Sequence, residues 1–243
     1  MAEGLGTAAA ALPGFVNLSL SDAALNQQLL QSPRRPLAGQ VIVAEYADPN
    51  PFKLLHAGHL YTAVVGDSIA NLLVYAGAQV HRVNYGGDVG LHVAKSIWAM
   101  QQDLGSYDLK KLQAIPAEGR ADWMNRAYIA GSEAYDTDPQ AKQAITELNR
   151  KIYLIQSEDD RKSDLARLYW TTRQWSYDYF QYFYDRIHIS FDKFYPESAT
   201  FAPGLEIVRQ QQAKGVFETS DGAVVFKGER FGLHTRVFIN SAG

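Results

Sequence analysis

Apolar and polar positions follow a strand, helix, strand order in the first third of the chain. A short apolar run at residues 41–46 precedes a turn rich in proline and asparagine, and a second apolar run occupies residues 80–84. Between them, from about His56, apolar residues recur three or four positions apart, as on one face of a helix, and Gly77 is suited to end that helix. This order predicts a right-handed βαβ unit, which begins a doubly wound parallel sheet. The apolar positions of the predicted helix are Val65, Ile69, Leu72, Leu73 and Ala76.

The spacing changes in the second half of the chain. Residues 138–190 have helical spacing with many charged and aromatic side chains, which predicts a helical insertion of two amphipathic helices. Apolar runs typical of strands return at residues 223–226 and 236–240, and we expect them to continue the parallel sheet. Because helices cover both faces of a parallel sheet, a sheet ending on a strand is expected to be incomplete. The predicted fold is therefore α/β, with a Rossmann-like doubly wound parallel sheet and a helical insertion.

A break in the pattern divides the start of the chain from the predicted sheet. Pro33, Pro36 and Gly39 interrupt helical spacing and favour a domain boundary near residue 39. Residues 1–12 are rich in alanine and glycine, and we expect them to form a flexible leader. The predicted domains are residues 1–38 and residues 39–243, with the insertion inside the second.

Composition excludes several classes of protein. The chain is 47% hydrophobic and 20% charged and has no cysteine, so it is globular in composition and can form neither disulfides nor thiolate metal sites. It lacks a run of about 20 apolar residues, so we expect no membrane span and a cytoplasmic location. The net charge of −3 gives no overall attraction for nucleic acid, so an RNA partner would have to bind a local site.

The candidate chemistry begins with two histidines at the start of the predicted helix. His56 and His59 lie three residues apart, with Gly58 between them, so both imidazoles share one helical face. The free N–H groups of a helix start favour an anion, and glycine allows a flat ligand to approach the backbone. The pattern favours phosphate binding, although a capping or metal-binding pair of histidines would have the same spacing.

The loop before the helix adds two more candidate ligands. Asn50 and Lys53 continue the three-residue spacing of the histidine pair, so a carboxamide and an ammonium can reach the same pocket. We interpret the remaining histidines as ordinary residues because their spacing is not typical of a ligand set. These are His81, His92, His188 and His234.

Longer motifs around these residues resemble a known family. Residues 45–60, which read EYADPNPFKLLHAGHL, resemble the class I aminoacyl-tRNA synthetase signature in the form used by arginyl-tRNA synthetases. Residues 82–90, RVNYGGDVG, are similar to the Asn-Tyr-x-Gly-Asp-Trp-Gly loop of that family. Further resemblance lies at residues 220–226 and 236–241, similar to the strands that lead to the second half of the active site. Residues 13–17 resemble the end of the family's N-terminal tRNA-contacting domain.

The resemblance implies activation of arginine by ATP and its transfer to tRNA by a class I catalytic domain. His56 and His59 would then hold the ATP phosphates and stabilise charge at the α-phosphate, with Lys53 adding a cation. Magnesium would be carried by the ATP phosphates, and the protein itself would supply no metal site. Gly58, Gly87, Asp88 and Gly90 would line the nucleotide pocket, and Asn50, Asn84, Tyr85 and Glu197 would bind the substrate, with Glu197 pairing with the guanidinium.

The chain also departs from the family pattern. Val89 replaces the usual tryptophan, and His92 begins a His-Val-Ala stretch in place of Gln-Phe-Gly. The family's arginine-reading Tyr and Asp, its Lys-Met-Ser-Lys-Ser loop and its anticodon-binding domain would follow Gly243. We therefore expect the first half of a catalytic domain, monomeric and inactive alone, with tRNA as a partner of the full-length protein.

Two alternatives remain open from the sequence. Another nucleotidyl transferase that uses His-x-Gly-His, such as a pantothenate-synthetase-like protein, would share the histidine motif, although the helical insertion and the Asn50 and Lys53 context argue against it. The chain could also be a non-catalytic module that binds ATP and an amino acid. Calorimetry with ATP, arginine and lysine would separate these readings.

Overall fold

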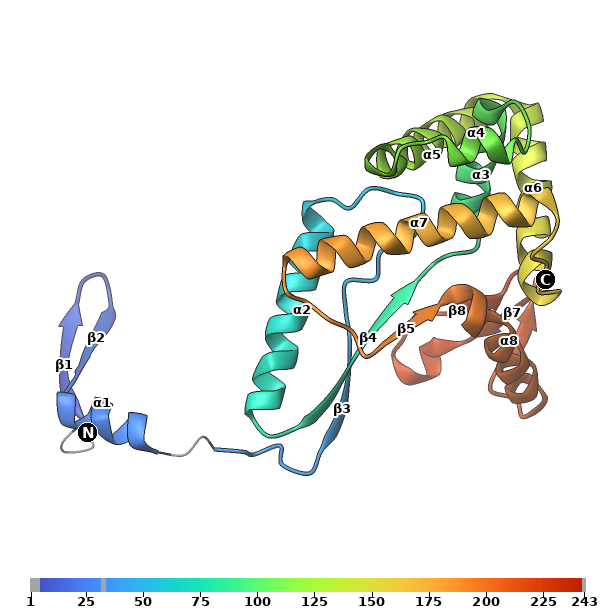
Figure 1. Cartoon of the computed structure of the whole chain (residues 1–243). Coiled ribbons are helices and arrows are strands. Elements are labelled where there is room, and N and C mark those ends of the chain that lie inside the picture. Colours follow the sequence, from blue (N-terminus) through green and yellow to red (C-terminus); the bar gives the residue numbers. More distant parts are fainter. Residues whose placement is uncertain (1–4, 32–33, 242–243) are drawn as a thin grey trace. The chain divides into compact units, whose positions relative to one another are not determined.

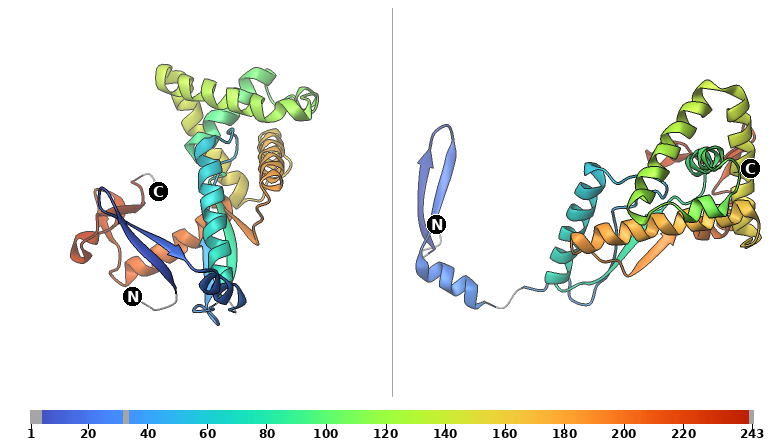
Figure 2. Two further views of the ribbon diagram at one scale, coloured as in Figure 1. Left: turned by 90° about the vertical axis from the view of Figure 1, so that its left-hand side faces the viewer. Right: turned by 45° about the horizontal axis from the view of Figure 1, so that its top comes forward.

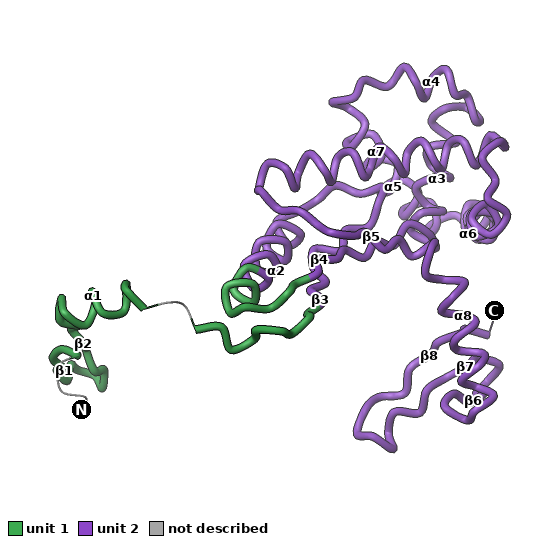
Figure 3. Tube along the Cα trace, turned by 60° about the horizontal axis from the view of Figure 1, so that its bottom comes forward, with its two compact units in different colours: residues 1–42, 71–80 green, residues 43–70, 81–243 purple. Residues whose placement is uncertain are grey.

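The computed structural model describes residues 5–31 and 34–241 of the chain. The chain divides into two compact units, Met1–Ile42 with Asn71–Val80, and Val43–Ala70 with His81–Gly243 (Figure 3). Across the described residues, every helix is too short or too polar to cross a membrane.

The first unit contains a hairpin and a short helix. Strand β1 (Gly6–Ala11) pairs antiparallel with β2 (Phe15–Leu20), and α1 (Asp22–Leu30) follows. The expectation of a flexible leader at residues 1–12 is wrong for Gly6–Ala11, which forms β1. The small side chains of this stretch have no alternation of apolar and polar residues that predicts a strand, and its order comes from backbone pairing with β2. The first four residues lie outside the described part of the chain.

The predicted βαβ unit is confirmed. Strand β3 (Val41–Glu45), helix α2 (Ala57–Tyr75) and strand β4 (Gln79–Gly86) follow one another, and Gly77 has the left-handed φ of +99° that a helix stop requires. The sheet order is β3-β4-β5, in which β5 (Lys193–Pro196) pairs parallel with β4. The Rossmann-like arrangement of strands therefore begins as the sequence predicts.

The main core lies among helices that follow β4. They form one cluster, drawn from green to orange in Figures 1 and 2, in which α3 and α5 pack closely and both contact α6. The two predicted insertion helices are present as α6 and α7. The helices are α3 (Leu91–Leu104), α4 (Leu109–Gln113), α5 (Arg120–Thr137), α6 (Pro139–Ser157) and α7 (Asp164–Arg186), with the 3-10 turn η1 (Ala117–Gly119) before α5.

The last strands form a sheet of their own, which corrects the expectation that they continue the parallel sheet. After α8 (Glu197–Ala213), strands β6 (Glu218–Ser220), β7 (Ala223–Phe226) and β8 (Arg236–Ile239) pair antiparallel, with the 3-10 turn η2 (Gly228–Phe231) before β8. The physical reason is the turn at Asp221 and Gly222, whose φ values of 49° and 79° are those of a two-residue hairpin. Such a turn sets β7 antiparallel to β6. The connection from Phe226 to Arg236 is also shorter than the roughly twelve residues that a parallel crossover needs, so β8 returns antiparallel to β7.

Candidate functional site

The loop between β3 and α2 is fastened to the helical cluster by side chains of α5 and α7. The backbone N–H of Phe52 donates to Oγ of Ser176 at 3.0 Å, and that of Leu55 donates to the hydroxyl of Tyr179 at 3.4 Å. Phe52 is fully buried in the core and has a positive φ of 68°. A buried anchor and a constrained backbone hold this loop in one conformation, which fixes where α2 begins.

The histidine pair lies at that helix start and is accessible to solvent. The ring centroids of His56 and His59 are 3.9 Å apart. Nδ1 of His59 accepts the backbone N–H of His56 at 3.2 Å, and Nδ1 of His56 accepts that of Gly58 at 3.1 Å. In the neutral form, a ring that accepts at Nδ1 carries its hydrogen on Nε2. Both rings can therefore donate from Nε2 to an anion.

Gly58 makes this arrangement of the first ring possible. A Cβ at this position would lie 2.8 Å from Cε1 and 2.9 Å from Nδ1 of His56. A larger residue here would push the exposed His56 ring away from the backbone of residue 58, so Gly58 permits this ring position without being required for the fold.

Lys53 lies beside the histidine pair. Its Nζ is 4.2 Å from the centroid of the Tyr128 ring, and the hydrogen bond between these two side chains lowers the pKa of the Tyr128 phenol. Burial lowers the pKa of His59, and the charges of His56 and Lys53 lower it further. The charge of Lys53 thus acts on the histidine pair at the amino end of α2. We call Lys53, His56 and His59 the cationic cluster.

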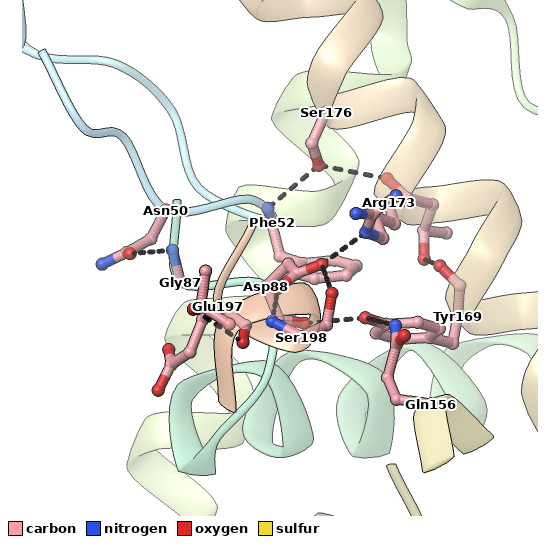
Figure 4. Close-up of polar contacts among 12 residues, drawn as sticks. Asn50, Phe52, Gly87, Asp88, Gln156, Tyr169, Arg173, Ser176, Glu197 and Ser198 are labelled. Atoms are coloured by element: carbon pink, nitrogen blue, oxygen red, sulfur yellow. Dashed lines mark hydrogen bonds and ion pairs between the residues drawn. The ribbon is translucent and has the colours of Figure 1, made fainter. Parts of the chain in front are cut away.

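A second group joins the loop to the start of α8. The Oδ1 of Asn50 accepts the backbone N–H of Gly87 at 3.1 Å (Figure 4). A Cβ at Gly87 would lie 2.6 Å from that oxygen and 3.2 Å from Oε2 of Glu197. The carboxamide and the carboxylate thus both lie where a side chain of residue 87 would project, so a larger residue there would displace them. We call Asn50, Gly87 and Glu197 the carboxylate cradle.

Glu197 is the anion of this cradle. Its side chain is half-buried, and burial, followed by the charge of Asp88, raises the pKa of its carboxyl. Among the residues that the structure describes, no Lys, Arg or His pairs with it. A partly desolvated carboxylate without a cation is suited to bind one from a ligand.

His92, interpreted from the sequence as an ordinary residue, lies between the two groups. Its Nε2 is 2.7 Å from the carbonyl oxygen of Gly87, so the ring donates to the cradle. Burial is the main cause that lowers the pKa of His92, and Lys53 lowers it too. A signal for this contact was present in the sequence: the resembled family has Gln where this chain has His92, and both side chains can donate a hydrogen bond to a carbonyl.

Two of the sequence-predicted ligands are instead bound within the protein. The buried side chain of Asn84 donates to the carbonyl of Tyr46 at 3.0 Å and to the hydroxyl of Tyr184 at 3.4 Å. Asp88 is fully buried, and its carboxylate contacts Arg173 and Ser198. These contacts leave both side chains directed at protein atoms.

The other predicted residues differ in burial: Tyr85 and Gly90 are half-buried, whereas Val89 is buried. Tyr85 is half-buried, its backbone N–H donates to Oδ1 of Asp48 at 2.7 Å, and burial raises the pKa of its phenol. Gly90 is the N-cap residue of α3 and has a φ of +103°. A Cβ added to Gly90 would lie 3.7 Å from the hydroxyl of Tyr153. Val89, at the family's tryptophan position, is buried in the core.

The two depressed histidines predict a loss of stability on acidification. Because the pKa values of His59 and His92 lie below the ordinary 6.5, the unfolded chain takes up protons below that pH that the folded chain resists. The free energy of unfolding should then fall as the pH drops below 6.5, by up to about 1.4 kcal/mol per pH unit for His92. The contribution of His59 should be smaller, because solvent screens this more exposed ring.

Urea denaturation of the wild type and of His92→Gln at several pH values measures this effect. Glutamine keeps a donor for Gly87 and does not titrate, so this variant should lose less stability than the wild type between about pH 7 and pH 5.5. Parallel curves for the two proteins would show that His92 has an ordinary pKa.

Comparisons with known proteins place these residues in context. Residues 20–242 match the family model described as class I tRNA synthetases (R), catalytic domain. The chain is 31% identical over 249 residues to the arginine–tRNA ligase of Amoebophilus asiaticus (strain 5a2), covering 95% of the chain and 41% of that relative. It is 28% identical over 229 residues to the arginine–tRNA ligase of Bdellovibrio bacteriovorus, covering 90% of the chain and 38% of that relative.

Two solved structures show the same fold. The arginyl-tRNA synthetase of Thermus thermophilus matches with a TM-score of 0.63 and 23% identity, over 100% of this chain and 40% of that one. The arginyl-tRNA synthetase of Plasmodium falciparum matches with a TM-score of 0.63 and 17% identity, over 98% and 41%. The chain thus spans about two fifths of the length of the relatives that it matches.

Proposed function

The chain belongs to the family of class I tRNA synthetase catalytic domains, in its arginine branch, and from this premise we propose that it carries the ATP-binding side and part of the arginine-binding side of an arginine–tRNA ligase. The observation that supports the proposal most is the pairing of two complementary groups. The cationic cluster lies at the start of α2, and the carboxylate cradle lies at the ends of the neighbouring strands. In a doubly wound sheet, ligands bind at these strand ends.

The cationic cluster is suited to the polyphosphate of ATP. Nε2 of each histidine and Nζ of Lys53 donate to phosphate oxygens, and the backbone N–H groups at the start of α2 add to them. When the arginine carboxylate attacks the α-phosphorus, pyrophosphate leaves and negative charge is redistributed over the phosphate oxygens. Fixed donors stabilise that charge and need not reorganise. Magnesium, bound to the phosphates, would neutralise further charge.

The carboxylate cradle is suited to the arginine side chain or its α-amino group. Glu197 can accept two parallel hydrogen bonds from a guanidinium, and the Asn50 amide, whose oxygen is held by Gly87, has its NH₂ group left to orient the substrate. Nucleotide contacts from Gly58, Gly87 and Gly90 and a substrate contact from Tyr85 belong to the same proposal. Asn84 and Asp88 would act by shaping the strand ends.

The setting of this activity follows from the relatives' names. We propose that the chain contributes to transfer of arginine to tRNA in a protein of the relatives' full length, as a monomer in the cytoplasm. A non-catalytic module that binds ATP and an amino acid is the second candidate, because the chain covers only part of those relatives.

Isothermal titration calorimetry with ATP, arginine and lysine tests the binding side of the proposal. Binding of ATP and a preference for arginine over lysine would support it. ATP binding without arginine binding would favour another nucleotidyl transferase, and binding of neither ligand would favour a scaffold without this activity.

Glu197→Gln should weaken arginine binding selectively. The substitution keeps the shape of the side chain and removes its charge, so a charge-assisted pair worth roughly 1.5–3 kcal/mol is lost, or about 10- to 100-fold in affinity. Glu206→Gln is the matched control, because Glu206 lies on the same helix and its carboxylate is exposed. Equal arginine affinities for the two variants would rule out Glu197 as the partner of the guanidinium.

A further inference from the structure

Asp88 connects three segments of the chain that are far apart in sequence. Its Oδ1 accepts the backbone N–H of Ser198 at 2.8 Å, and its Oδ2 accepts the hydroxyl of Ser198 at 2.7 Å. Nε of Arg173, on α7, donates to Oδ2 at 2.6 Å. The backbone carbonyl of Asp88 accepts the hydroxyl of Tyr169 at 2.9 Å. The loop after β4, helix α7 and the start of α8 are thus joined through one buried residue (Figure 4).

These contacts determine where the cradle carboxylate lies. Glu197 is the residue before Ser198 in the first turn of α8, and the helix start has no side-chain cap of its own. The Asp88 carboxylate receives the Ser198 N–H, as a capping group would, but from a different segment. The position of Glu197 beside Gly87 therefore depends on Asp88.

The two carboxylates of this region, Asp88 and Glu197, differ in burial and in ion pairing. The Asp88 side chain is fully buried and paired with Arg173, whose side chain is 17% exposed. Glu197 is half-buried and has no cation among the described residues. The Asp88 carboxylate already accepts from Arg173 and Ser198, so its oxygens are engaged within the protein. Glu197 is the carboxylate beside Gly87 that remains open to a cationic ligand.

We propose that the Asp88–Arg173 pair is a positioning device that holds Glu197 in the cradle and reserves it for a guanidinium from the substrate. The substrate class rests on the function proposed above, whereas the positioning of Glu197 stands on the contacts of Asp88 alone. In this proposal Glu197 contacts the amino acid, and the cationic cluster contacts the nucleotide. A change to Asp88 or Arg173 should therefore lower the affinity for arginine and leave the affinity for ATP nearly unchanged.

Asp88→Asn tests the pair. Asparagine fills the same volume, but it has one acceptor oxygen where three donors converge, and its NH₂ group faces one of those donors. The expected result is a loss of arginine affinity of tenfold or more with ATP affinity changed less than twofold. Ser198→Ala is a milder variant that removes only the hydroxyl contact, and Ser198→Thr, which keeps a hydroxyl, should restore the affinity of the wild type.

A readout without ligands separates this inference from the proposed function. Carbon-detected NMR of labelled glutamate carboxyls follows the titration of Glu197, and Asp88→Asn should lower the pKa of Glu197 because it removes a neighbouring negative charge. Arg173→Gln should raise it, because the charge of Asp88 is then uncompensated. These opposite shifts show only that both charges act on Glu197. Ser198→Ala removes the hydroxyl contact with Asp88 and changes no charge, so a shifted Glu197 titration in that variant reports a displaced carboxyl, which the positioning role predicts.

Two results decide the inference. If the wild type binds no arginine but Ser198→Ala shifts the Glu197 titration, the proposed function fails and the positioning role stands. If the wild type binds arginine, while Asp88→Asn and Ser198→Ala bind it equally well and the Glu197 titration does not move in Ser198→Ala, the inference is overturned. Thermal melts identify a variant that fails to fold, and for that case Ser198→Ala decides.

Discussion

Replacing His56 and His59 together by alanine should lower the affinity for ATP at least 100-fold and leave the fold intact. Each imidazole offers an Nε2 donor to the phosphates, and a hydrogen bond to a charged group is worth roughly 1.5–3 kcal/mol, so two of them account for about two to four orders of magnitude. His56 is exposed and the ring contacts of the pair are mainly with each other and with the local backbone. The melting temperature should therefore change little.

Calorimetric titration with ATP and a thermal melt measure the two parts of this prediction. His234→Ala is the matched control, because His234 is also exposed but lies between η2 and β8. If the double variant bound ATP as tightly as the control, the phosphate site would have to be assigned elsewhere on the chain.

Gly131→Ala should cause the largest loss of stability of any conservative substitution considered for this chain. Gly131 lies in α5, where that helix crosses α3, and an added Cβ would overlap the backbone carbonyl of Lys95. A backbone atom in a packed helix cannot move aside as a flexible side chain can. Overpacking of this kind costs about 3 kcal/mol, which for a chain of this size lowers the melting temperature by roughly 10 °C.

A glycine in an open position supplies the control for that prediction. Gly204 lies inside α8, and a Cβ there would meet no atom within 4 Å. Gly204→Ala should raise the free energy of unfolding by about 0.5–1 kcal/mol, because alanine favours the helix. Differential scanning calorimetry compares the two variants, and a neutral effect of Gly131→Ala would mean that α3 and α5 can separate without cost.

The sequence predicts the elements whose signals are local. The βαβ unit of β3, α2 and β4 has clear periods and a glycine stop, and α6 and α7 have an amphipathic pattern long enough to identify. Strand β5 was missed because it has only four residues and its partner β4 lies more than a hundred positions earlier. The place of β5 in the sheet depends on its pairing with β4, and the local sequence around β5 carries no information about that distant partner.

The candidate site shows the same division between local and distant information. The spacing of Lys53, His56 and His59 follows directly from the sequence, and the roles assigned to them stay predictions. The contacts of Asp88 with Arg173 and Ser198 join residues separated by 85 and 110 positions, so its burial could not be derived from the loop motif. The spacing of His92 carries no ligand signal, although it lies in the first turn of α3, directly after the glycine motif.

Helix α7 holds both parts of the site from one side. Within three turns of this helix, Ser176 and Tyr179 fasten the loop that ends at the histidine pair, while Tyr169 and Arg173 fasten Asp88. Because one helix of 23 residues makes both sets of contacts, a displacement of α7 would move the histidine loop and Asp88 together. Under the proposed function, binding of the nucleotide and of the amino acid would then be coupled through this helix, even without shared side chains.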